Sequence, residues 1–362
     1  MVEIKYCPST LAEGYDSYSP QAVKRLFDGR KVSPYLDFNI SELKQTDEIV
    51  RAMQRISVSG VQEKFSGVID GNLIRIAESS ERATYIIKPA PWDETIATRK
   101  QIPANEHVTM QIARQVYGIV TAENGLCFTK DGQTVYITKR FDILLDGTKA
   151  EMEDFASLIG RNEQTDGTYF KYSGCYEDIA KCIKKYIPAW MVDMERFFEL
   201  VVFNYIYANG DDHLKNFSVI RQGGDYRLAP AYDLLNTSLH VIGDDFGLDG
   251  GLSPDIETSD VMDRTGHACR LDFERFGERI GLTNARVKRV LDKYMAVPEG
   301  AVKLVGNSYL NDKMKRKYLR IVDERVKRFV RGGYDFGTGL FFVVIIIKNI
   351  LVIVCISYYS LL

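Results

Sequence analysis

The sequence predicts an α+β fold of two lobes, with a small β-rich lobe followed by a larger helical lobe. Between residues 56 and 137, short apolar runs alternate with turn-forming residues, which is the pattern of strands and hairpins. From about residue 151, apolar side chains recur at helical spacing instead. A polar loop at residues 209–218 interrupts this helical part and carries residue types suited to catalysis.

The bulk composition is that of an ordinary folded protein. The chain has 362 residues, of which 45% are hydrophobic and 27% charged, and its net charge is −2. A general nucleic-acid binder would carry a basic surplus, so direct nucleic-acid binding is not expected. The six cysteines include no C-x-x-C pair, and the N-terminus lacks a basic-then-apolar signal. A cytoplasmic protein is therefore expected.

Four segments are expected along the chain. They are an N-terminal extension at residues 1–49, the β-rich lobe at 50–145, the helical lobe at 146–332 and an apolar tail at 333–362. Residues 340–362 have the length of a membrane span, but Lys348 and Asn349 at their centre would be costly in a bilayer. A core segment, a partner-covered segment or sequence beyond the natural domain end is therefore favoured over a membrane anchor.

The β-rich lobe contains two features suited to nucleotide phosphates. Residues 56–69 predict a strand, a turn and a strand around Gly60, where free backbone amides could cradle phosphate oxygens. A plain hairpin is the alternative, because the pattern is neither G-x-G-x-x-G nor a P-loop. Lys88 ends the apolar run of residues 84–88, where a lysine can contact ATP phosphates or merely cap a sheet edge.

Further strands and a helix complete this lobe. Short strands are predicted at residues 73–76, 126–128 and 135–137, with turns between them. A helix is predicted over residues 104–117, beginning after Pro103 and stopping at Gly118. Glu106 in its first turn either pairs with Lys88 or simply favours the helix dipole, and the sequence leaves both open.

The polar loop has the spacing of a phosphoryl-transfer site. Asp211 and Asn216 fit the D-x-x-x-x-N of kinase catalytic loops, in which the carboxylate meets the acceptor hydroxyl. A helix over residues 191–206 buries one apolar face and is expected to stop at Asn209-Gly210, which can adopt left-handed conformations. A rigid element beneath Asp211 would thus position it.

A hairpin brings a second acidic residue to this loop. Strands are predicted at residues 217–220 and 226–228 around Gly223-Gly224, which would place Asn216 beside Asp233. Amide and carboxylate oxygens of this kind suit Mg²⁺. The sequence therefore predicts a kinase that uses ATP and Mg²⁺.

Two D-F-G triplets compete with Asp233 for the metal role. Asp245-Phe246-Gly247 and Asp335-Phe336-Gly337 are both interpreted as accidental, because no short hairpin places either beside Asn216. Residues 243–263 are expected to form a surface loop or a rim for a basic substrate. The remaining helices are predicted at residues 273–280, 285–294 and 312–329.

Five motifs in order resemble the HipA family, the serine/threonine kinase toxins of bacterial toxin–antitoxin modules. They are Ser59-Gly60-Val61-Gln62-Glu63-Lys64, Tyr85-Ile86-Ile87-Lys88-Pro89, Lys139-Arg140-Phe141-Asp142, residues 209–218 and Ala231-Tyr232-Asp233-Leu234-Leu235. The resemblance covers roughly residues 50–330. The short N-terminal segment resembles the compact HipT-type members. Asp211-x-His213-x-x-Asn216 is also similar to phosphoinositide kinases, whose fold the family shares.

The resemblance implies roles for individual residues. Asp211 would be the catalytic base, and Asn216 and Asp233 would bind Mg²⁺. His213 would support the loop or the phosphate, or else be a buried structural histidine. The other nucleotide contacts implied are Lys88 with Ser59, Gly60 and Val61 for phosphates, Lys139 and Phe141 for adenine through the backbone, and Asp142 for ribose.

The resemblance also implies regulation and partners. Family members autophosphorylate a glycine-loop serine, here Ser57 or Ser59, and the added charge of about −2 beside ATP phosphates would be repulsive and switch the kinase off. Known members phosphorylate aminoacyl-tRNA synthetases beside a HipB-like DNA-binding antitoxin, and compact ones beside a small HipS-like partner. Two alternatives stay open: an antibiotic-type small-molecule phosphotransferase, and a non-catalytic pseudokinase acting as a binding module.

Overall fold

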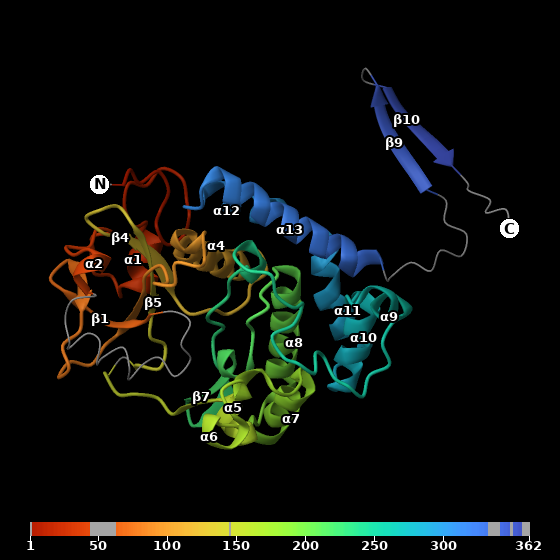
Figure 1. The fold of residues 1–362 in the computed structure, drawn as a ribbon, viewed down its shortest axis with the longest axis horizontal. Coiled ribbons are helices and arrows are strands. Elements are labelled where there is room, and N and C mark those ends of the chain that lie inside the picture. Colours follow the sequence, from red (N-terminus) through yellow and green to blue (C-terminus); the bar gives the residue numbers. More distant parts are fainter. Residues whose placement is uncertain (1, 44–62, 145, 332–340, 348–349, 357–362) are drawn as a thin grey trace.

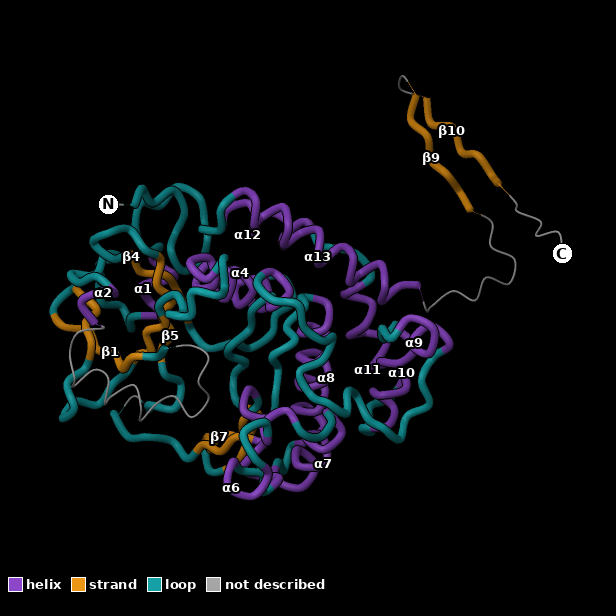
Figure 2. The backbone as a smooth tube through the Cα atoms, in the orientation of Figure 1, coloured by secondary structure: helices purple, strands orange, loops and turns teal. Residues whose placement is uncertain are grey.

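The computed structural model describes residues 2–43, 63–144, 146–331, 341–347 and 350–356. Within these ranges the chain folds as an antiparallel sheet region followed by a helical region, as Figure 1 shows in the order of the sequence colours. The predicted α+β fold class is confirmed. Strands predominate in the first region, and Figure 2 shows helices predominating in the second.

The elements predicted at residues such as 73–76, 104–117 and 312–329 are observed with boundaries shifted by at most a few residues, whereas several other elements were not predicted. In the first region they are α1 (Pro20–Leu26), α2 (Ile40–Leu43), β1 (Phe65–Asp70), β2 (Leu73–Ile76), β3 (Tyr85–Lys88), η1 (Arg99–Gln101), α4 (Ile102–Gln115), β4 (Asn124–Phe128) and β5 (Thr134–Lys139). Next come β6 (Met152–Asp154), α5 (Phe155–Ile159), α6 (Glu163–Asp166), η2 (Phe170–Tyr172), α7 (Tyr176–Tyr186), α8 (Trp190–Ile206), η3 (Leu214–Asn216), β7 (Ser218–Gln222) and β8 (Asp225–Leu228). The last are η4 (Thr237–Leu239), α9 (Asp260–Thr265), α10 (Arg270–Arg279), α11 (Asn284–Leu291), η5 (Asp292–Tyr294), α12 (Glu299–Asn307), α13 (Asp312–Arg331), β9 (Phe341–Ile347) and β10 (Ile350–Ile356).

In the described part of the chain, the N-terminal lobe holds a sheet with the strand order β2-β1-β3-β5-β4. Every neighbouring pair of these strands is antiparallel. Short turns join β1 to β2 and β4 to β5, whereas the connection from β3 to β4 contains α4. The β3–β5 register sets Lys88 opposite Tyr136. The pairing thus fixes the end of β3, which carries the lysine predicted to meet ATP.

The N-terminal segment covers one face of this sheet. Tyr18, Leu26 and Phe27 are buried and share a hydrophobic cluster with Tyr85 and Ile87 of β3. A Ser19 side chain caps α1, accepting a hydrogen bond from the Ala22 amide at 3.3 Å. The N-terminal segment, which was predicted as an extension, therefore contributes many of the buried side chains of this hydrophobic cluster.

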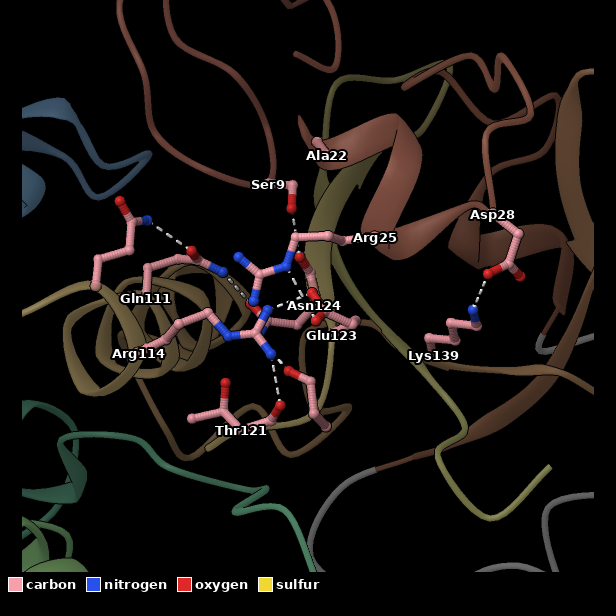
Figure 3. Close-up of polar contacts among 12 residues, drawn as sticks. Ser9, Ala22, Arg25, Asp28, Gln111, Arg114, Thr121, Glu123, Asn124 and Lys139 are labelled. Atoms are coloured by element: carbon pink, nitrogen blue, oxygen red, sulfur yellow. Dashed lines mark hydrogen bonds and ion pairs between the residues drawn. The ribbon is translucent and has the colours of Figure 1, made fainter. Parts of the chain in front are cut away.

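Polar contacts tie β4 to helices on both sides (Figure 3). Glu123 accepts from Arg25 of α1 at 3.2 Å and also pairs with Arg114 of α4. Next to it, Asn124 accepts a hydrogen bond from Gln111 of α4 at 2.8 Å. These bonds hold α4 against the sheet in a single rotational setting.

Helix α4 is buried along most of its length. Residues 102–113 are all buried, polar ones included. The helix packs on β4 and β5 and against α12. Its Thr109 hydroxyl lies 2.9 Å from the Tyr318 hydroxyl of α13. The last helices of the chain therefore brace the helix that faces the sheet.

The helical lobe is built around α8. Phe197, Phe198, Val201 and Tyr205 are buried in the main hydrophobic cluster, which confirms the predicted apolar face. The predicted end of this helix was wrong in detail. The helix ends at Ile206, and the residue in the left-handed conformation is Ala208, with φ of 54°, one position before the predicted Asn209-Gly210.

One further expectation needs correction. Residues 243–263 are not simply a surface loop, since Gly247 and Leu248 are buried and α9 begins at residue 260. Within the apolar tail, the described residues 341–347 and 350–356 form the antiparallel strands β9 and β10, which pair with each other as a separate sheet. Across the described residues, none of the helices combines the length and apolar character needed to cross a bilayer.

Candidate active site

A pocket of about 830 Å³ is lined by residues from both lobes. The predicted site residues that line it are Lys88, Lys139, Phe141, Asp142, Asp211, His213, Asn216 and Asp233. The structure therefore brings together residues that are spread over more than a hundred positions of sequence. Ser57, Ser59, Gly60 and Val61 lie outside the described residues, as does the D-F-G triplet at 335–337.

Lys88 and Glu106 form an ion pair inside the pocket. The Lys88 ammonium lies 2.6 Å from Glu106 Oε1, and the two side chains are 5% and 1% exposed. Lys88 also pairs with Asp233. Burial by itself would lower the pKa of Lys88, but Asp233 and Glu106 outweigh it and raise the pKa above its usual value. Lys88 is therefore charged. Of the two roles that the sequence left open for Glu106, the structure shows the ion pair with Lys88.

Burial raises the pKa of Glu106 to about 7, although Lys88 opposes the shift. For Asp233, burial also acts upward, but Lys64 and Lys88 outweigh it and hold the pKa far below its usual range. The Lys64 ammonium lies 3.5 Å from Asp233 Oδ2. Asp233 therefore carries most of the negative charge that balances Lys88.

The backbone at Asp233 is unusual. Its φ is 61°, in the left-handed region that non-glycine residues rarely adopt. Residues held in such conformations cluster at functional sites, because the surrounding structure must stabilise them. Here the preceding Tyr232 hydroxyl donates to the Lys215 carbonyl at 2.8 Å and lies 2.6 Å from the Ser218 hydroxyl. These bonds bring the segment before Asp233 onto the start of β7.

Asp211 precedes the β7–β8 hairpin in the chain, Asp233 follows it, and both line the pocket. Its Oδ1 accepts a hydrogen bond from the Tyr172 hydroxyl at 2.8 Å, and its carbonyl accepts one from the Asn216 side-chain amide at 2.8 Å. The first bond fixes one carboxylate oxygen and leaves the other for a ligand. The second closes the loop of residues 211–216 and orients the Asn216 amide.

The neighbouring Asp212 anchors this loop from beneath. Burial raises the pKa of Asp212 to about 7. Its carboxylate accepts from the Tyr176 hydroxyl at 2.6 Å, from the Asn204 amide at 3.0 Å and from the Gly247 backbone N–H at 2.9 Å. Asp212 is thus a structural residue, held by three donors from separate parts of the chain.

The D-F-G triplet at 245–247 serves this anchor. A Cβ at Gly247 would lie 2.5 Å from the Asp212 nitrogen, so only glycine allows the approach. Asp245 instead pairs with Arg325 of α13 and with His267 at 2.7 Å. It is absent from the pocket lining, whereas Asp233 is present. The triplet is accidental as a metal motif but has a structural role that the sequence did not indicate.

Asn105 joins α4 to the loop that follows Asp233. Its side-chain amide donates to the Asn236 carbonyl at 2.9 Å and accepts from the Asn236 backbone N–H at 3.2 Å. This pairing imitates a strand ladder between a side chain and a backbone. The helix that carries Glu106 and the loop that carries Asp233 are therefore held in one fixed relationship.

His213 is buried, and burial lowers its pKa to about 4. The ring is consequently neutral at neutral pH. It packs edge-on to Tyr172, with ring centroids 5.2 Å apart, and its Nδ1 finds no hydrogen-bond partner among the described residues. A neutral imidazole can support the loop or donate one hydrogen bond, but it cannot supply positive charge to a phosphate.

The crossing between the lobes runs along residues 139–142. The Lys139 side chain pairs with Asp28 of the N-terminal segment, and its backbone N–H donates to the Glu123 carbonyl at 2.8 Å. Figure 3 shows the Lys139 side chain pointing to Asp28. The Lys139 N–H is thus already bonded within the protein. Asp142 is held by Arg140, with Oδ2 2.6 Å from the guanidinium.

Sequence reasoning missed two groups of the pocket. Lys64, the residue immediately before β1, approaches Asp233 at 3.5 Å, and the sequence pattern did not indicate this contact. In η2, Lys171 lines the pocket and Tyr172 donates a hydrogen bond to Asp211, which the irregular sequence of residues 163–175 did not indicate. The burial of Lys171 becomes apparent only once the fold is known.

The side-chain oxygens of Asn216 and Asp233 are suited to bind a magnesium ion. Asn216 donates through its nitrogen, so its side-chain oxygen is available, and Asp233 offers an ionised carboxylate. Mg²⁺ accepts a few such oxygens and completes its shell with water and phosphates. The described residues contain no group of three or more His, Cys, Asp or Glu side chains arranged as a metal cage. A magnesium site shared with a nucleotide does not require one.

Comparisons with known proteins agree on one family. Residues 56–301 match the family described as HipA-like C-terminal domain. A Haemophilus influenzae protein named "Putative kinase" is 25% identical over 326 residues, which cover 82% of this chain and 88% of the relative. The Sinorhizobium fredii protein named "Putative kinase Y4dM" is 33% identical over 208 residues, covering 53% of this chain and 47% of its own length. The chain thus spans about half of that relative.

A solved structure shares the fold. HipA of Shewanella oneidensis, solved with HipB and its operator DNA, superposes with a TM-score of 0.60 at 17% identity. The match covers 75% of this chain and 65% of that one. At this identity the likeness bears on the fold alone, and it agrees with the sheet lobe and helical lobe described above.

Proposed function

The chain belongs to the HipA-like C-terminal domain family of kinases, and from this premise we propose that it transfers the γ-phosphate of ATP to a serine or threonine hydroxyl of a protein. The observation that carries the proposal is the convergence of Asp211, Asn216 and Asp233 on one pocket with the Lys88–Glu106 pair. Positioned charge of this kind is the main contribution of a kinase to phosphoryl transfer.

Each residue has a chemical task in this proposal. Asp211 accepts the proton of the acceptor hydroxyl, and Tyr172 holds its carboxylate in place. Asn216 and Asp233 hold Mg²⁺, which neutralises charge on the phosphates when bound. Lys88 and Lys64, which now neutralise Asp233, are placed to meet phosphate oxygens. The division into lobes at residues 50–145 and 146–332 belongs to the same proposal.

The test is transfer of radiolabelled phosphate from ATP with Mg²⁺ by the purified chain, comparing wild type with Asp211→Asn. The variant keeps the size and the Tyr172 contact but loses the base, so transfer is expected to fall by on the order of 10² or more. Asp225→Asn on the exposed turn of the β7–β8 hairpin is the matched control and should keep full activity. An Asp211→Asn protein that still labels substrate at the wild-type rate would refute the assignment.

We propose further that the protein is the cytoplasmic toxin of a toxin–antitoxin module, of the compact HipT-like type. This rests on the family resemblance, which implies an aminoacyl-tRNA synthetase as substrate and HipB-like and HipS-like partners. Growth arrest on expression, relieved by Asp211→Asn, supports a toxin, whereas antibiotic resistance without arrest supports the small-molecule phosphotransferase. Absence of any ATP turnover with Mg²⁺ supports the pseudokinase.

Autophosphorylation of Ser57 or Ser59 is part of the same proposal. Alanine at both positions should abolish phosphate incorporation at the glycine loop, measured by mass spectrometry of the digested protein. Unchanged incorporation in the double variant would contradict it.

A further inference from the structure

Lys171 is a buried lysine with an unusual environment. It lies in η2 and lines the pocket, and only 6% of its surface is exposed. Buried lysines are rare unless an anion pairs with them. Within the described ranges, no carboxylate lies within ion-pairing distance of Lys171. Its ammonium instead lies 4.8 Å from the centroid of the Tyr172 ring.

Most of the other lysines that line the pocket have carboxylate partners, and Lys149, which forms no ion pair with the described residues, is exposed to solvent. Lys88 pairs with Glu106 and Asp233, Lys64 approaches Asp233 at 3.5 Å, and Lys215 pairs with Asp154 at 2.9 Å. Of the two pocket lysines that are buried, Lys88 and Lys171, only Lys171 lacks a carboxylate partner among the described residues. The pocket thus holds a buried lysine that makes no ion pair with a carboxylate of the described residues.

The surroundings of Lys171 point it toward the chemistry. Burial lowers the pKa of Lys171, while Asp211 and Asp233 act in the opposite direction and Lys64 and Lys215 reinforce the lowering. All four of these groups belong to the pocket. Its neighbour Tyr172 donates directly to Asp211 at 2.8 Å. One short turn therefore orients the proposed base and presents a cation next to it.

An incoming anion would repay the cost of this arrangement. An ammonium group removed from water is unfavourable until an opposite charge arrives, and then it interacts more strongly than in solvent. The anion that the pocket is proposed to receive near Asp211 is the terminal phosphate of ATP. Its equatorial oxygens carry the charge during transfer.

We infer that Lys171 is a catalytic residue whose ammonium group contacts the phosphoryl group as it passes from ATP to the acceptor. The inference rests on the proposed function. In the step, the acceptor oxygen bonds to the γ-phosphorus, and the bond from that phosphorus to the bridging oxygen breaks with its electron pair left on ADP. The hydroxyl proton goes to the Asp211 carboxylate. Lys171 meets the equatorial oxygens from the helical lobe, opposite Lys88 on the sheet lobe.

The experiment compares Lys171→Met, Lys171→Arg and a control, Lys185→Met. Lys185 is a good match because its ammonium also lies 4.8 Å from the ring of the next residue, Tyr186, but it is exposed and outside the pocket. Three quantities are measured: the rate of phosphate transfer at saturating Mg²⁺ and ATP, the dissociation constant of ADP, and that of ADP with aluminium fluoride. Aluminium fluoride beside ADP imitates the phosphoryl group in transit.

A cation that stabilises transferred phosphate contributes about 10³-fold or more to the rate. Lys171→Met should therefore lose about 10³-fold in transfer rate and bind ADP with aluminium fluoride at least roughly tenfold more weakly, while ADP affinity stays unchanged. Lys171→Arg should recover part of both losses, and Lys185→Met should match wild type.

The possible failures are distinguishable. If wild type transfers phosphate and Lys171→Met does so equally well, the inference is overturned and the proposed function stands. Equal losses of ADP affinity and of affinity for ADP with aluminium fluoride, with a lower melting temperature, would assign Lys171 a structural role and also overturn it. A wild-type protein that transfers no phosphate overturns the proposed function, and the inference with it.

Discussion

Glu106 reaches Lys88 from the first turns of α4, and the two charged groups meet 2.6 Å apart in a space that solvent hardly enters. The pair connects the helix to the last residue of β3. Because Lys88 also contacts Asp233, three elements share one charge centre. Variants that disrupt this charge centre should therefore impair nucleotide binding or phosphate transfer more than they destabilise the rest of the fold.

Lys88→Met should reduce phosphate transfer by on the order of 10² or more, because the variant loses the ammonium that contacts both Glu106 and Asp233, and Lys64 contacts Asp233 alone. Glu106→Gln should cost less, since the amide oxygen can still accept a hydrogen bond from Lys88. The measurement is the transfer rate together with ATP affinity for each variant. A Glu106→Gln loss larger than that of Lys88→Met would contradict this ranking.

Asp233→Asn should raise the Mg²⁺ concentration needed for half-maximal transfer by about tenfold or more, because the ion loses its one charged protein ligand. Titration of the rate with Mg²⁺ at fixed ATP measures the effect. Asp211→Asn should leave the affinity for Mg²⁺ and ATP near wild type, so it separates ion binding from chemistry. An unchanged Mg²⁺ requirement in Asp233→Asn would remove Asp233 from the metal site.

Gly247→Ala should destabilise the protein by about 1–3 kcal/mol, because the added Cβ would meet the Asp212 backbone at 2.5 Å. Gly243→Ala is the matched control. A Cβ at Gly243 has nothing within 4 Å, and that change should be neutral or slightly stabilising. Urea unfolding of the three proteins gives the comparison. Equal stability of both variants would show that the segment can move away from Asp212 at no cost.

His107 should make stability depend on pH. Burial lowers its pKa to about 4 from 6.5, and its Nε2 lies 2.9 Å from the Ser9 carbonyl, so the folded state holds the ring neutral. Below pH 6.5 the unfolded chain takes up the proton first. The contribution of His107 is therefore complete above pH 6.5 and is lost as the pH falls toward 4.

The slope due to this one residue is about 1 kcal/mol per pH unit between pH 6 and 4.5. His107→Gln keeps a donor for Ser9 and removes the titration. The free energy of unfolding should fall less steeply with acid in that variant than in wild type. His213 and His240, also buried with lowered pKa values, are common to both proteins and cancel in the difference. Parallel slopes would exclude the proposed effect.

Local pattern was enough to predict much of the site. The D-x-x-x-x-N spacing and the glycine turn of the β7–β8 hairpin placed Asp211, Asn216 and Asp233 in one pocket, because a short hairpin leaves the chain little choice of path. The strand at residues 73–76 was predicted with its observed bounds for a similar reason. Where the chain is closely constrained by its neighbours, sequence suffices.

Long-range contacts were beyond such reasoning. Tyr172 and Asp211, which share a hydrogen bond, come from segments with no shared periodicity, and Gly247 approaches Asp212 from a glycine-rich stretch that resembled a solvated loop. The choice between a paired and a merely helix-stabilising Glu106 depends on which way α4 faces. That direction is set by burial against α12 and α13, elements about two hundred residues later.

The burial of α4 has a consequence for how the protein can be kept idle. Kinases whose glutamate-bearing helix is free can be silenced by swinging it outward. Here an outward swing would strip apolar side chains of residues 102–113 from both the sheet and the final helices, at a cost of about 1.5–3 kcal/mol for each large one exposed. The burial of α4 therefore opposes such a movement of the helix. Inhibition of the protein would have to act on nucleotide binding, on acceptor binding or through a partner outside the chain.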